Sequence, residues 1–324
     1  MVVALKKTRI VFLDRGTIGP TVKLRSPGFE HDWQDYQQTS ADEVIGRLQH
    51  ADIAITNKVA ITASMLPELP HLRCIAVAAT GANMLDLTAC HAAGVVVCNI
   101  QGYAKHTVPE HTFAALLALR RNLFEYRDQV NSGVWQEAKQ FCFFNRPIHD
   151  LHGATLSLLG TGTIAQETGR LGEAFGMQVQ YHSLSNRTDS GLPLVDFETL
   201  VTTADVLSIH CPLNQASHAI IDDQVFARMK KSALLVNTAR GQIVDIEALS
   251  HALQQQQIAG AAIDVCDDEP PASDAVVMKL ATLPNFLLTP HIAWASVNAM
   301  QILTDQLIDN LEAFAAGHPK NVLK

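Results

Sequence analysis

Short apolar runs alternate along the chain with segments whose apolar residues recur at helical spacing. Such runs favour strands that are buried on both faces of a parallel sheet. In the first hundred residues they predict strands at 9–13, 53–56, 72–79 and 95–98, separated by helical segments at 41–50, 62–67 and 85–93. Residues 17–40 are polar and irregular, and no element is predicted there. Strands and helices that alternate in this way indicate a parallel α/β domain.

A second series follows a long helix that opens at Thr107-Val108-Pro109-Glu110, a capping-box pattern with proline in the first turn. This series predicts strands at 156–159, 178–182, 206–209, 234–236, 259–265 and 286–288, with helices at 195–203, 222–229 and 245–255. A terminal helix is expected at 293–316. The sequence therefore predicts an α/β protein of two parallel-sheet domains, one formed by residues 1–102 plus 294–324 and the other by residues 103–293.

The strand at 156–159 ends in Gly160-Thr161-Gly162-Thr163-Ile164-Ala165, and a helix is expected from about Thr163. The glycines let the backbone turn tightly and pass close to a ligand, while the small Ala165 suffices for packing of helix on strand. Free N–H groups at the helix N-terminus attract a pyrophosphate. The stretch therefore predicts a dinucleotide site.

The composition argues against several classes of partner and location. Of the 324 residues 48% are apolar and 17% charged, and the net charge of −8 argues against nucleic acid or an anionic membrane as a partner. Residues 1–7 lack the apolar core of a signal peptide, and no apolar stretch approaches the ~20 residues of a membrane span. The six cysteines form no CxxC pair, so we expect reduced thiols in a cytoplasmic protein.

Residues 131–149 are irregular and rich in aromatic side chains. Together with the apolar positions from Phe113 to Phe144, they carry more apolar surface than one domain should expose, so we expect a homodimer. His106 and His111 flank the start of the long helix without an acid at metal-ligand spacing. They are interpreted as structural, and no metal site is predicted.

Polar residues follow several strands of the second series, where ligands bind in sheets of this kind. They are His210-Cys211-Pro212, then Thr238-Ala239-Arg240, then Asp264 and Glu269, and finally His291. Taken singly, Arg240 could be a surface charge, Glu269 a solvated loop residue and His291 a turn residue. Because all three end strands of one predicted sheet, a shared catalytic role is the preferred interpretation.

These motifs resemble those of the D-isomer-specific 2-hydroxyacid dehydrogenases. The resemblance rests on Gly160-x-Gly162-x-x-Ala165, Asn237-Thr238-Ala239-Arg240-Gly241, Asp264-Val265 with Glu269-Pro270, and Thr289-Pro290-His291, and it spans essentially the whole chain. Three further strings resemble the glycerate dehydrogenase (hydroxypyruvate reductase) branch, namely Val11 to Arg15, Thr56 to Val59 and Thr80 to Asn83. The resemblance implies a Rossmann nucleotide-binding domain inserted into a flavodoxin-like substrate domain.

The resemblance also implies a reversible hydride transfer between a nicotinamide cofactor and a small 2-keto acid. Arg240 would hold and polarise the keto acid, His291 would supply the proton, and Glu269 would orient the imidazole. Backbone N–H groups around Thr80, Gly81 and Ala82 would bind the substrate carboxylate. Cofactor contacts would come from the glycine bend at 160–164 and from Ser183, Cys211, Pro212, Thr238, Ala239, Arg240, Asp264 and His291.

The choice between NAD and NADP turns on the end of the strand at 178–182. NAD-specific domains usually place an acid there to bind the ribose hydroxyls, and in this chain that position falls on Ser183. We therefore favour NADP, with Arg187 as a candidate for the 2′-phosphate. Dual use, or NAD held by other contacts, stays open.

Two alternatives to a glycerate dehydrogenase remain. One is another enzyme of the family, of the D-lactate or phosphoglycerate type. The other is a dinucleotide-sensing interaction protein that keeps the fold without turnover.

Overall fold

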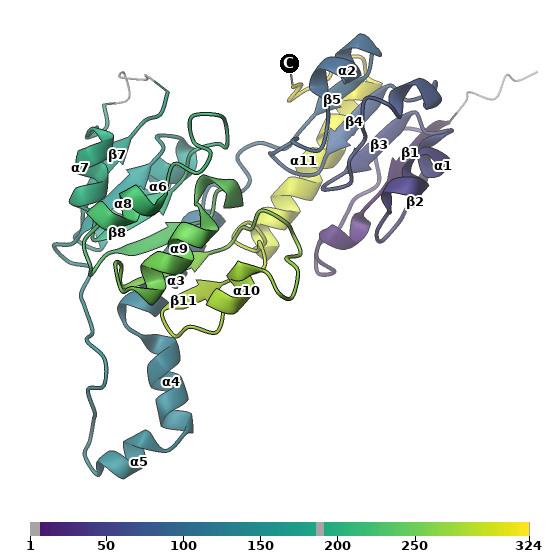
Figure 1. Ribbon diagram of the computed structural model, residues 1–324. Coiled ribbons are helices and arrows are strands. Elements are labelled where there is room, and N and C mark those ends of the chain that lie inside the picture. Colours follow the sequence, from purple (N-terminus) through teal and green to yellow (C-terminus); the bar gives the residue numbers. More distant parts are fainter. Residues whose placement is uncertain (1–6, 186–190, 324) are drawn as a thin grey trace, which may run out of the picture. The chain divides into compact units, whose positions relative to one another are not determined.

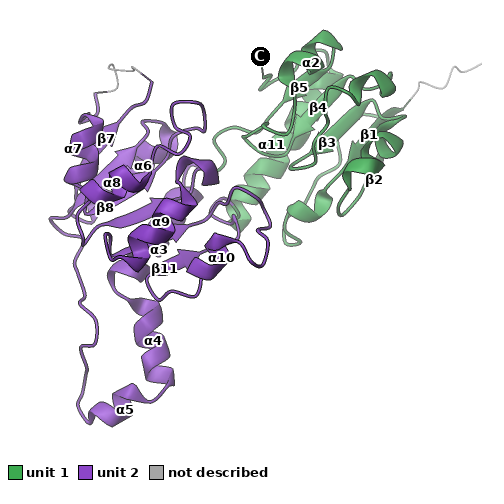
Figure 2. Ribbon diagram, in the orientation of Figure 1, with its two compact units in different colours: residues 1–104, 295–324 green, residues 105–294 purple. Residues whose placement is uncertain are grey.

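The computed structural model of the protein describes residues 7–185 and 191–323 (Figure 1). The chain divides into two compact units, residues 1–104 with 295–324 (unit 1) and residues 105–294 (unit 2), as Figure 2 shows. The described part of each unit contains one all-parallel sheet, of five strands in unit 1 and six in unit 2. The predicted α/β class with two parallel sheets is confirmed.

Unit 1 has the strand order β2-β1-β3-β4-β5, which is the flavodoxin-like order 2-1-3-4-5. Its strands are β1 (Thr8–Phe12), β2 (His31–Asp35), β3 (Ile53–Thr56), β4 (Cys74–Val77) and β5 (Val96–Cys98). Its helices are α1 (Val44–Leu48), α2 (Leu87–Ala92) and α11 (Val297–Ala315), with short 3-10 turns at Arg15–Thr17, Ala41–Glu43 and Leu66–Glu68. Topological reversal between β1 and β3 creates a crevice at their carboxyl ends.

Strand β2 lies in the segment for which no element was predicted. Its sequence is His-Asp-Trp-Gln-Asp, and none of its residues is buried. The strand occupies the edge of the sheet and pairs only with β1 among the described strands. An edge strand needs no apolar run, so the sequence pattern does not show it.

Unit 2 has the order β11-β10-β9-β8-β6-β7. Its strands are β6 (Thr155–Leu159), β7 (Gln178–His182), β8 (Val206–Ile209), β9 (Leu234–Asn237), β10 (Gly260–Ile263) and β11 (Phe286–Leu288). An isolated parallel bridge from Tyr181 to Leu194 lies beyond β7. If β6 is numbered 1, β7 is 2 and this bridge is a very short strand 3, then β8, β9 and β10 are strands 4, 5 and 6. The order is then 3-2-1-4-5-6, which is that of the dinucleotide-binding fold, and β11 is one additional strand.

Helices cover both faces of the unit 2 sheet (Figure 1). They are α3 (Thr107–Arg120), α6 (Thr163–Ala174), α7 (Phe197–Thr202), α8 (Asp223–Arg228), α9 (Ile246–Gln254) and α10 (Val276–Leu280). Leu156 and Val236 pack in one core with Leu116 of α3. Leu207 and Leu235 pack in the other with residues of α8 and α9. Alternate residues of each strand thus pack into the cores on the two faces of the sheet. The carboxyl edge of the sheet is not covered by either core, and ligands bind at that edge in sheets of this kind.

Two predicted details of the helices are wrong. The capping box at Thr107 does not form, because His106 is the N-cap residue and the Thr107 hydroxyl donates to the Ala293 carbonyl at 3.1 Å. The long helix was expected to carry Leu123 on its apolar face, but it ends at Arg120, since Asn122 adopts a left-handed conformation with φ 50°.

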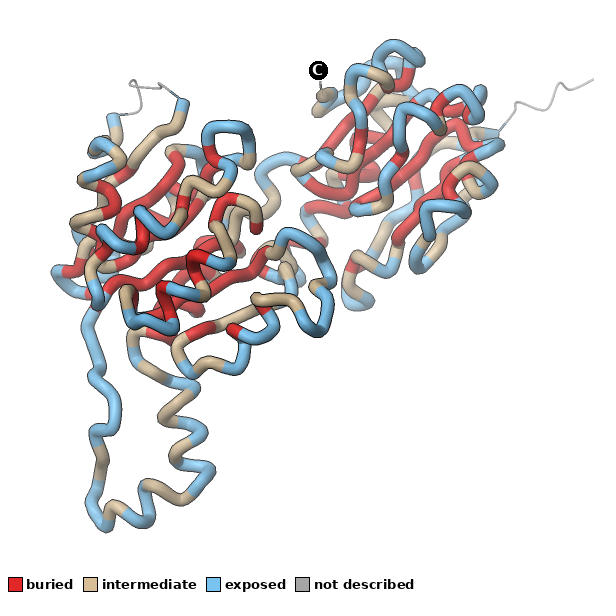
Figure 3. Tube along the Cα trace, viewed as in Figure 1, coloured by how far each residue is buried: buried red, intermediate tan, exposed pale blue. Residues whose placement is uncertain are grey.

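Residues 121–150, which we call the arm, form α4 (Leu123–Asn131), α5 (Val134–Ala138) and an extended return (Figure 1). The arm was predicted to be irregular from residue 131 onward, and α5 corrects this. No residue of the arm is buried, as the absence of red in this segment of Figure 3 shows. Tyr126 packs against Phe143 within the arm, with 5.4 Å between the ring centroids, and the Trp135 indole N–H donates to the Gln140 carbonyl at 3.2 Å. Phe141 and Phe144, by contrast, are 90% and 81% exposed. In the described part of the chain, no helix is long and apolar enough to span a membrane.

Candidate active site

The glycine bend lies at the carboxyl end of β6, beside β8, where the strand order of unit 2 reverses. Gly160 has φ 122°, and a Cβ there would stand 2.6 Å from the His210 carbonyl oxygen, so only glycine fits. A Cβ on Gly162 would meet no atom within 4 Å. Gly162 is the N-cap of α6 and no side chain caps that helix end. Open space in front of uncapped N–H groups fits a pyrophosphate.

Helix α6 also lies unusually close to the sheet. A Cβ on Gly169 would meet Tyr181, and one on Gly172 would stand 2.7 Å from Leu156 Cδ2. Ala165 is fully buried beneath the bend. The two later glycines were not singled out in the sequence, although their spacing of three on one helix face was a usable signal.

The residues after β7 and β8 follow the two strands that flank β6. The Ser183 hydroxyl donates to the carbonyl of Ser185, and residues 182–185 contain no carboxylate. Arg187 lies outside the described residues. Burial lowers the pKa of His210 to about 4 and raises the pKa of the Cys211 thiol to about 11. Both side chains are therefore neutral at physiological pH.

Arg240 follows β9 in a turn whose backbone is held by hydrogen bonds to the Asn237 side chain. The buried Asn237 amide donates to the Arg240 carbonyl at 2.8 Å and accepts from Ala239 N at 3.0 Å. At Gly241 the turn lies against the segment after β10. A Cβ on residue 241 would stand only 2.6 Å from the Asp267 backbone nitrogen, so the close approach requires glycine. The loops after these neighbouring strands are thereby fixed against each other.

Glu269 and His291 form a direct pair. Glu269 Oε2 lies 2.6 Å from His291 Nδ1, while Glu269 Oε1 accepts the N–H of Cys266 at 2.9 Å. Because Nδ1 is engaged, the other ring nitrogen is the one that can reach a ligand. The Glu269 and His291 side chains are 32% and 25% exposed, so the pair is accessible from solvent.

Asp264, at the end of β10, anchors the segment that carries His291. Its buried carboxylate accepts from Thr289 Oγ1 at 2.5 Å and from the N–H groups of Ile292 and Ala293, each at 2.9 Å. The His291 N–H donates to the Asp264 carbonyl at 2.8 Å. These bonds hold His291 in a left-handed conformation with φ 54°, which a residue with a Cβ seldom adopts.

His111 of α3 also reaches this cluster. Its Nε2 lies 3.2 Å from Thr289 Oγ1 and 3.7 Å from Asp264 Oδ1. Sequence reasoning treated His111 as structural and did not connect it to Asp264. The sequence gives no signal for this contact, because His111 is distant in the chain from Asp264 and Thr289.

Among the predicted site residues, Glu269 and His291 are in direct contact. The loop that carries Arg240 is in contact, at Gly241, with the loop after β10 that carries Glu269. Thr80, Gly81 and Ala82 belong to unit 1, where they follow β4. The Thr80 hydroxyl donates to the Ile100 carbonyl at 2.8 Å, and the Asn99 amide donates to the Thr80 carbonyl at 2.7 Å. This turn is thus held in place by the segment that follows the neighbouring strand β5.

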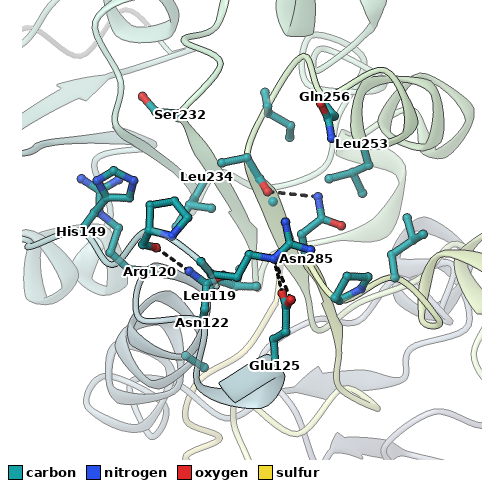
Figure 4. Close-up of a pocket in the computed structure, with 18 of the residues that line it drawn as sticks. Leu119, Arg120, Asn122, Glu125, His149, Ser232, Leu234, Leu253, Gln256 and Asn285 are labelled. Carbon is teal, nitrogen blue, oxygen red and sulfur yellow. Dashed lines mark hydrogen bonds and ion pairs between the residues drawn. The ribbon is translucent and has the colours of Figure 1, made fainter. Parts of the chain in front are cut away.

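A cavity of about 710 Å³ lies at the opposite, amino-terminal edge of the unit 2 sheet (Figure 4). Leu234, the first residue of β9, and Asn285, just before β11, line it. Some of its polar groups are bonded to one another, as Arg146 is to Glu125 at 2.7 Å and Asn122 is to the Pro147 carbonyl at 2.7 Å. It lies at the other end of the strands from Arg240 and His291, so it is separate from the predicted site at the carboxyl edge.

Residues 113–293 match the family model described as "D-isomer specific 2-hydroxyacid dehydrogenase, NAD binding domain". The chain is 44% identical to a glycerate dehydrogenase of Methylorubrum extorquens, over 98% of this chain and 99% of the relative. It is 32% identical to a hydroxypyruvate reductase of Blautia hydrogenotrophica, over 88% of each. Among solved structures, an acyclic imino acid reductase in complex with NADPH and D-Arg matches 98% of this chain and 100% of that one with a TM-score of 0.84 and 27% identity. The D-lactate dehydrogenase of Aquifex aeolicus, complexed with NAD and lactic acid, matches 95% of this chain and 96% of that one with a TM-score of 0.78 and 26% identity.

Proposed function

The chain belongs to the D-isomer specific 2-hydroxyacid dehydrogenase family, and we propose that it reduces hydroxypyruvate or glyoxylate and, in reverse, oxidises D-glycerate. As a member of this family it is an NAD(P)-dependent oxidoreductase that acts on the CH–OH group of D-2-hydroxy acids. The observation that carries the finer proposal is the 44% identity to a glycerate dehydrogenase along the full length. The Glu269–His291 pair supports turnover rather than binding alone.

In this proposal, Arg240 forms hydrogen bonds to the keto acid and draws electron density toward the carbonyl oxygen. The nicotinamide, when bound, supplies or accepts the hydride. Negative charge that builds on the substrate oxygen is neutralised by a proton from His291 Nε2. Glu269 holds the ring at Nδ1 and stabilises the imidazolium, so that the proton is available where it is needed. In oxidation the same nitrogen accepts the proton.

Unit 1 contributes the carboxylate site of the substrate in the same proposal. The N–H groups of Thr80, Gly81 and Ala82 follow a buried parallel strand, as anion-binding backbone groups do at the carboxyl edge of such sheets. Gly162 and the uncapped first turn of α6 would bind the pyrophosphate of the cofactor. Cys211, Pro212, Thr238, Ala239 and Asp264 would line the rest of the cofactor path.

For the cofactor we favour NADP over NAD. Ser183 stands where a carboxylate would repel a 2′-phosphate, and its hydroxyl turns toward Ser185. Solved relatives hold NADPH in one case and NAD in three others, so the relatives themselves do not favour NADP.

We also propose a homodimer formed through the arm, and a cytoplasmic location. Phe141 and Phe144 are 90% and 81% exposed, and with Trp135 they make an apolar surface that a second copy would cover. All six cysteines are free thiols, and four of them are buried, which suits a reducing compartment.

A panel of keto acids assayed with both reduced cofactors tests the proposed function. We expect the highest kcat/KM with hydroxypyruvate or glyoxylate, and a higher value with NADPH than with NADH. Preference for pyruvate would favour a D-lactate enzyme, and preference for phosphohydroxypyruvate a phosphoglycerate enzyme. Dinucleotide binding without turnover of any keto acid would favour the interaction protein.

A further inference from the structure

The segment that carries His291 is supported by the sheet on one side only. It follows β11, which lies at the edge of the sheet and pairs only with β10 among the described strands. Pro290, just before His291, has no N–H to donate. The backbone of His291 is left-handed, with φ 54°. Such a conformation persists only where surrounding contacts maintain it, so another element has to contribute.

Helix α3 makes contacts on both sides of His291. The Thr107 hydroxyl donates to the Ala293 carbonyl at 3.1 Å, and His111 Nε2 lies 3.2 Å from Thr289 Oγ1. Thr107 and His111 are four residues apart and therefore lie on one face of the helix. Thr289 and Ala293 each stand two residues from His291. The helix is thus bonded to the segment both before and after the imidazole.

The direction of the bond between His111 and Thr289 follows from the hydroxyl proton. A threonine hydroxyl has one proton, and Thr289 donates it to Asp264 Oδ1 at 2.5 Å. Thr289 Oγ1 can then only accept from the ring, so His111 Nε2 carries a proton and donates it. A chain of hydrogen bonds runs from His111 through Thr289 to Asp264. Ile292 and Ala293 donate their N–H groups to the same carboxylate.

We infer that His111 is a positioning residue, which fixes the orientation of the His291 imidazole through its hydrogen bond to Thr289. This inference rests on the proposed function and adds a residue that acts through another. The Asp264 side chain is 2% exposed, and hydrogen bonds at such a buried carboxylate are stronger than in water. Without the N–H of His111, the segment loses one of its fixed points and the imidazole can shift. A displacement of about 1 Å can lower a rate by about 100-fold.

The test measures kcat for the keto acid that the wild type reduces best, per cofactor-binding site. Fluorescence titration with the preferred reduced cofactor counts the sites, which removes any loss of folded enzyme from the comparison. In His111→Leu we expect kcat per site to fall about 10- to 100-fold, while KM for the keto acid and Kd for the cofactor stay within about threefold. His111→Gln keeps an N–H donor and should retain kcat within about threefold.

His106→Leu is the matched control. His106 is the exposed N-cap residue of the same helix, and its side chain makes no capping bond, so kcat should stay at the wild-type value. Thr289→Val removes the partner of His111 and should lower kcat as well. Adding His111→Leu to Thr289→Val should lower kcat by no more than about threefold further, because both changes remove the same bond.

A kcat per site within about threefold of the wild type in His111→Leu would overturn the inference. Equal losses in His111→Leu and His111→Gln would overturn it too, as would a double variant in which the two single losses multiply. If His111→Leu does not fold, His111→Phe takes its place in these comparisons. A wild-type enzyme that reduces no keto acid would instead refute the proposed function.

Discussion

Glu269 Oε2 lies 2.6 Å from Nδ1 of His291, although the two residues stand 22 positions apart and follow different strands. The contact depends on the left-handed backbone of His291, which the Asp264 carboxylate maintains through its bonds to Ile292 and Ala293. The ring thus has one nitrogen bound to a carboxylate, which leaves the other nitrogen for a ligand. This arrangement is what general acid catalysis by an imidazole requires.

Glu269→Gln removes the charge while it keeps an oxygen for the N–H of Cys266. Without the carboxylate, the protonated imidazole is less stable, and reduction depends on that form. We expect kcat for reduction to fall by about 10- to 100-fold at pH 7. Steady-state kinetics with a keto acid and a reduced cofactor measures this. A kcat within about threefold of the wild type would mean that Glu269 does not act on the proton donor.

Gly160→Ala and Gly162→Ala separate folding from cofactor binding. Gly160 combines φ 122° with a Cβ position 2.6 Å from the His210 carbonyl, so alanine should cost more than about 2 kcal/mol of stability. Gly162 has ordinary backbone and open space, so alanine should leave Tm within a few degrees. Its methyl group would occupy the pyrophosphate position, and we expect the Kd for NADPH to rise about tenfold. Equal effects of the two variants on Tm would contradict this.

Replacement of the arm aromatics tests the dimer. Phe141→Ser with Phe144→Ser removes two highly exposed rings that contribute nothing to the core of unit 2. We expect sedimentation to show a dimer for the wild type and a monomer, or a dimer weakened about 100-fold or more, for the variant. The far-UV circular dichroism should not change. A wild-type monomer would exclude the proposed assembly.

His210 should make stability sensitive to acid. Burial lowers its pKa to about 4, below the ordinary value of 6.5, so the unfolded chain binds this proton first as the pH falls. Stability from this group is therefore complete above about pH 6.5 and is lost as the pH approaches 4. His210→Gln should show a smaller decline of Tm between pH 7 and 4.5 than the wild type. His251→Gln, at an exposed histidine, serves as the control and should decline as the wild type does.

Much of the fold is predictable because its determinants are local. Strands β3, β7, β8 and β11 are confirmed to the residue. Strands β3, β8 and β11 are short apolar runs, while β7 alternates polar and apolar residues. Strand β2 and helix α5 escaped prediction for the opposite reason, because none of their residues is buried. The end of α3 depends on a left-handed Asn122, which periodicity does not encode.

The candidate site was likewise predictable where it depends on local sequence and not where it depends on contacts between distant residues. The sequence placed Arg240, Glu269 and His291 after three strands of one sheet, and parallel topology brings such ends to one edge. It could not show that Asp264 bonds the His291 segment, nor that His111 reaches Thr289, because these contacts join residues that are distant in the chain. Their formation depends on how the loops fold over the sheet.

The central claim is that His291 transfers the proton during reduction of the keto acid. His291→Asn tests it most directly, because asparagine tolerates the left-handed backbone that His291 adopts. His251→Ala is the control, since this exposed histidine is also paired with a carboxylate, that of Asp223. The account predicts that kcat for hydroxypyruvate with NADPH falls about 10²- to 10⁴-fold in His291→Asn while the Kd for NADPH and the control stay near wild type. A kcat within about threefold of wild type in His291→Asn would contradict it.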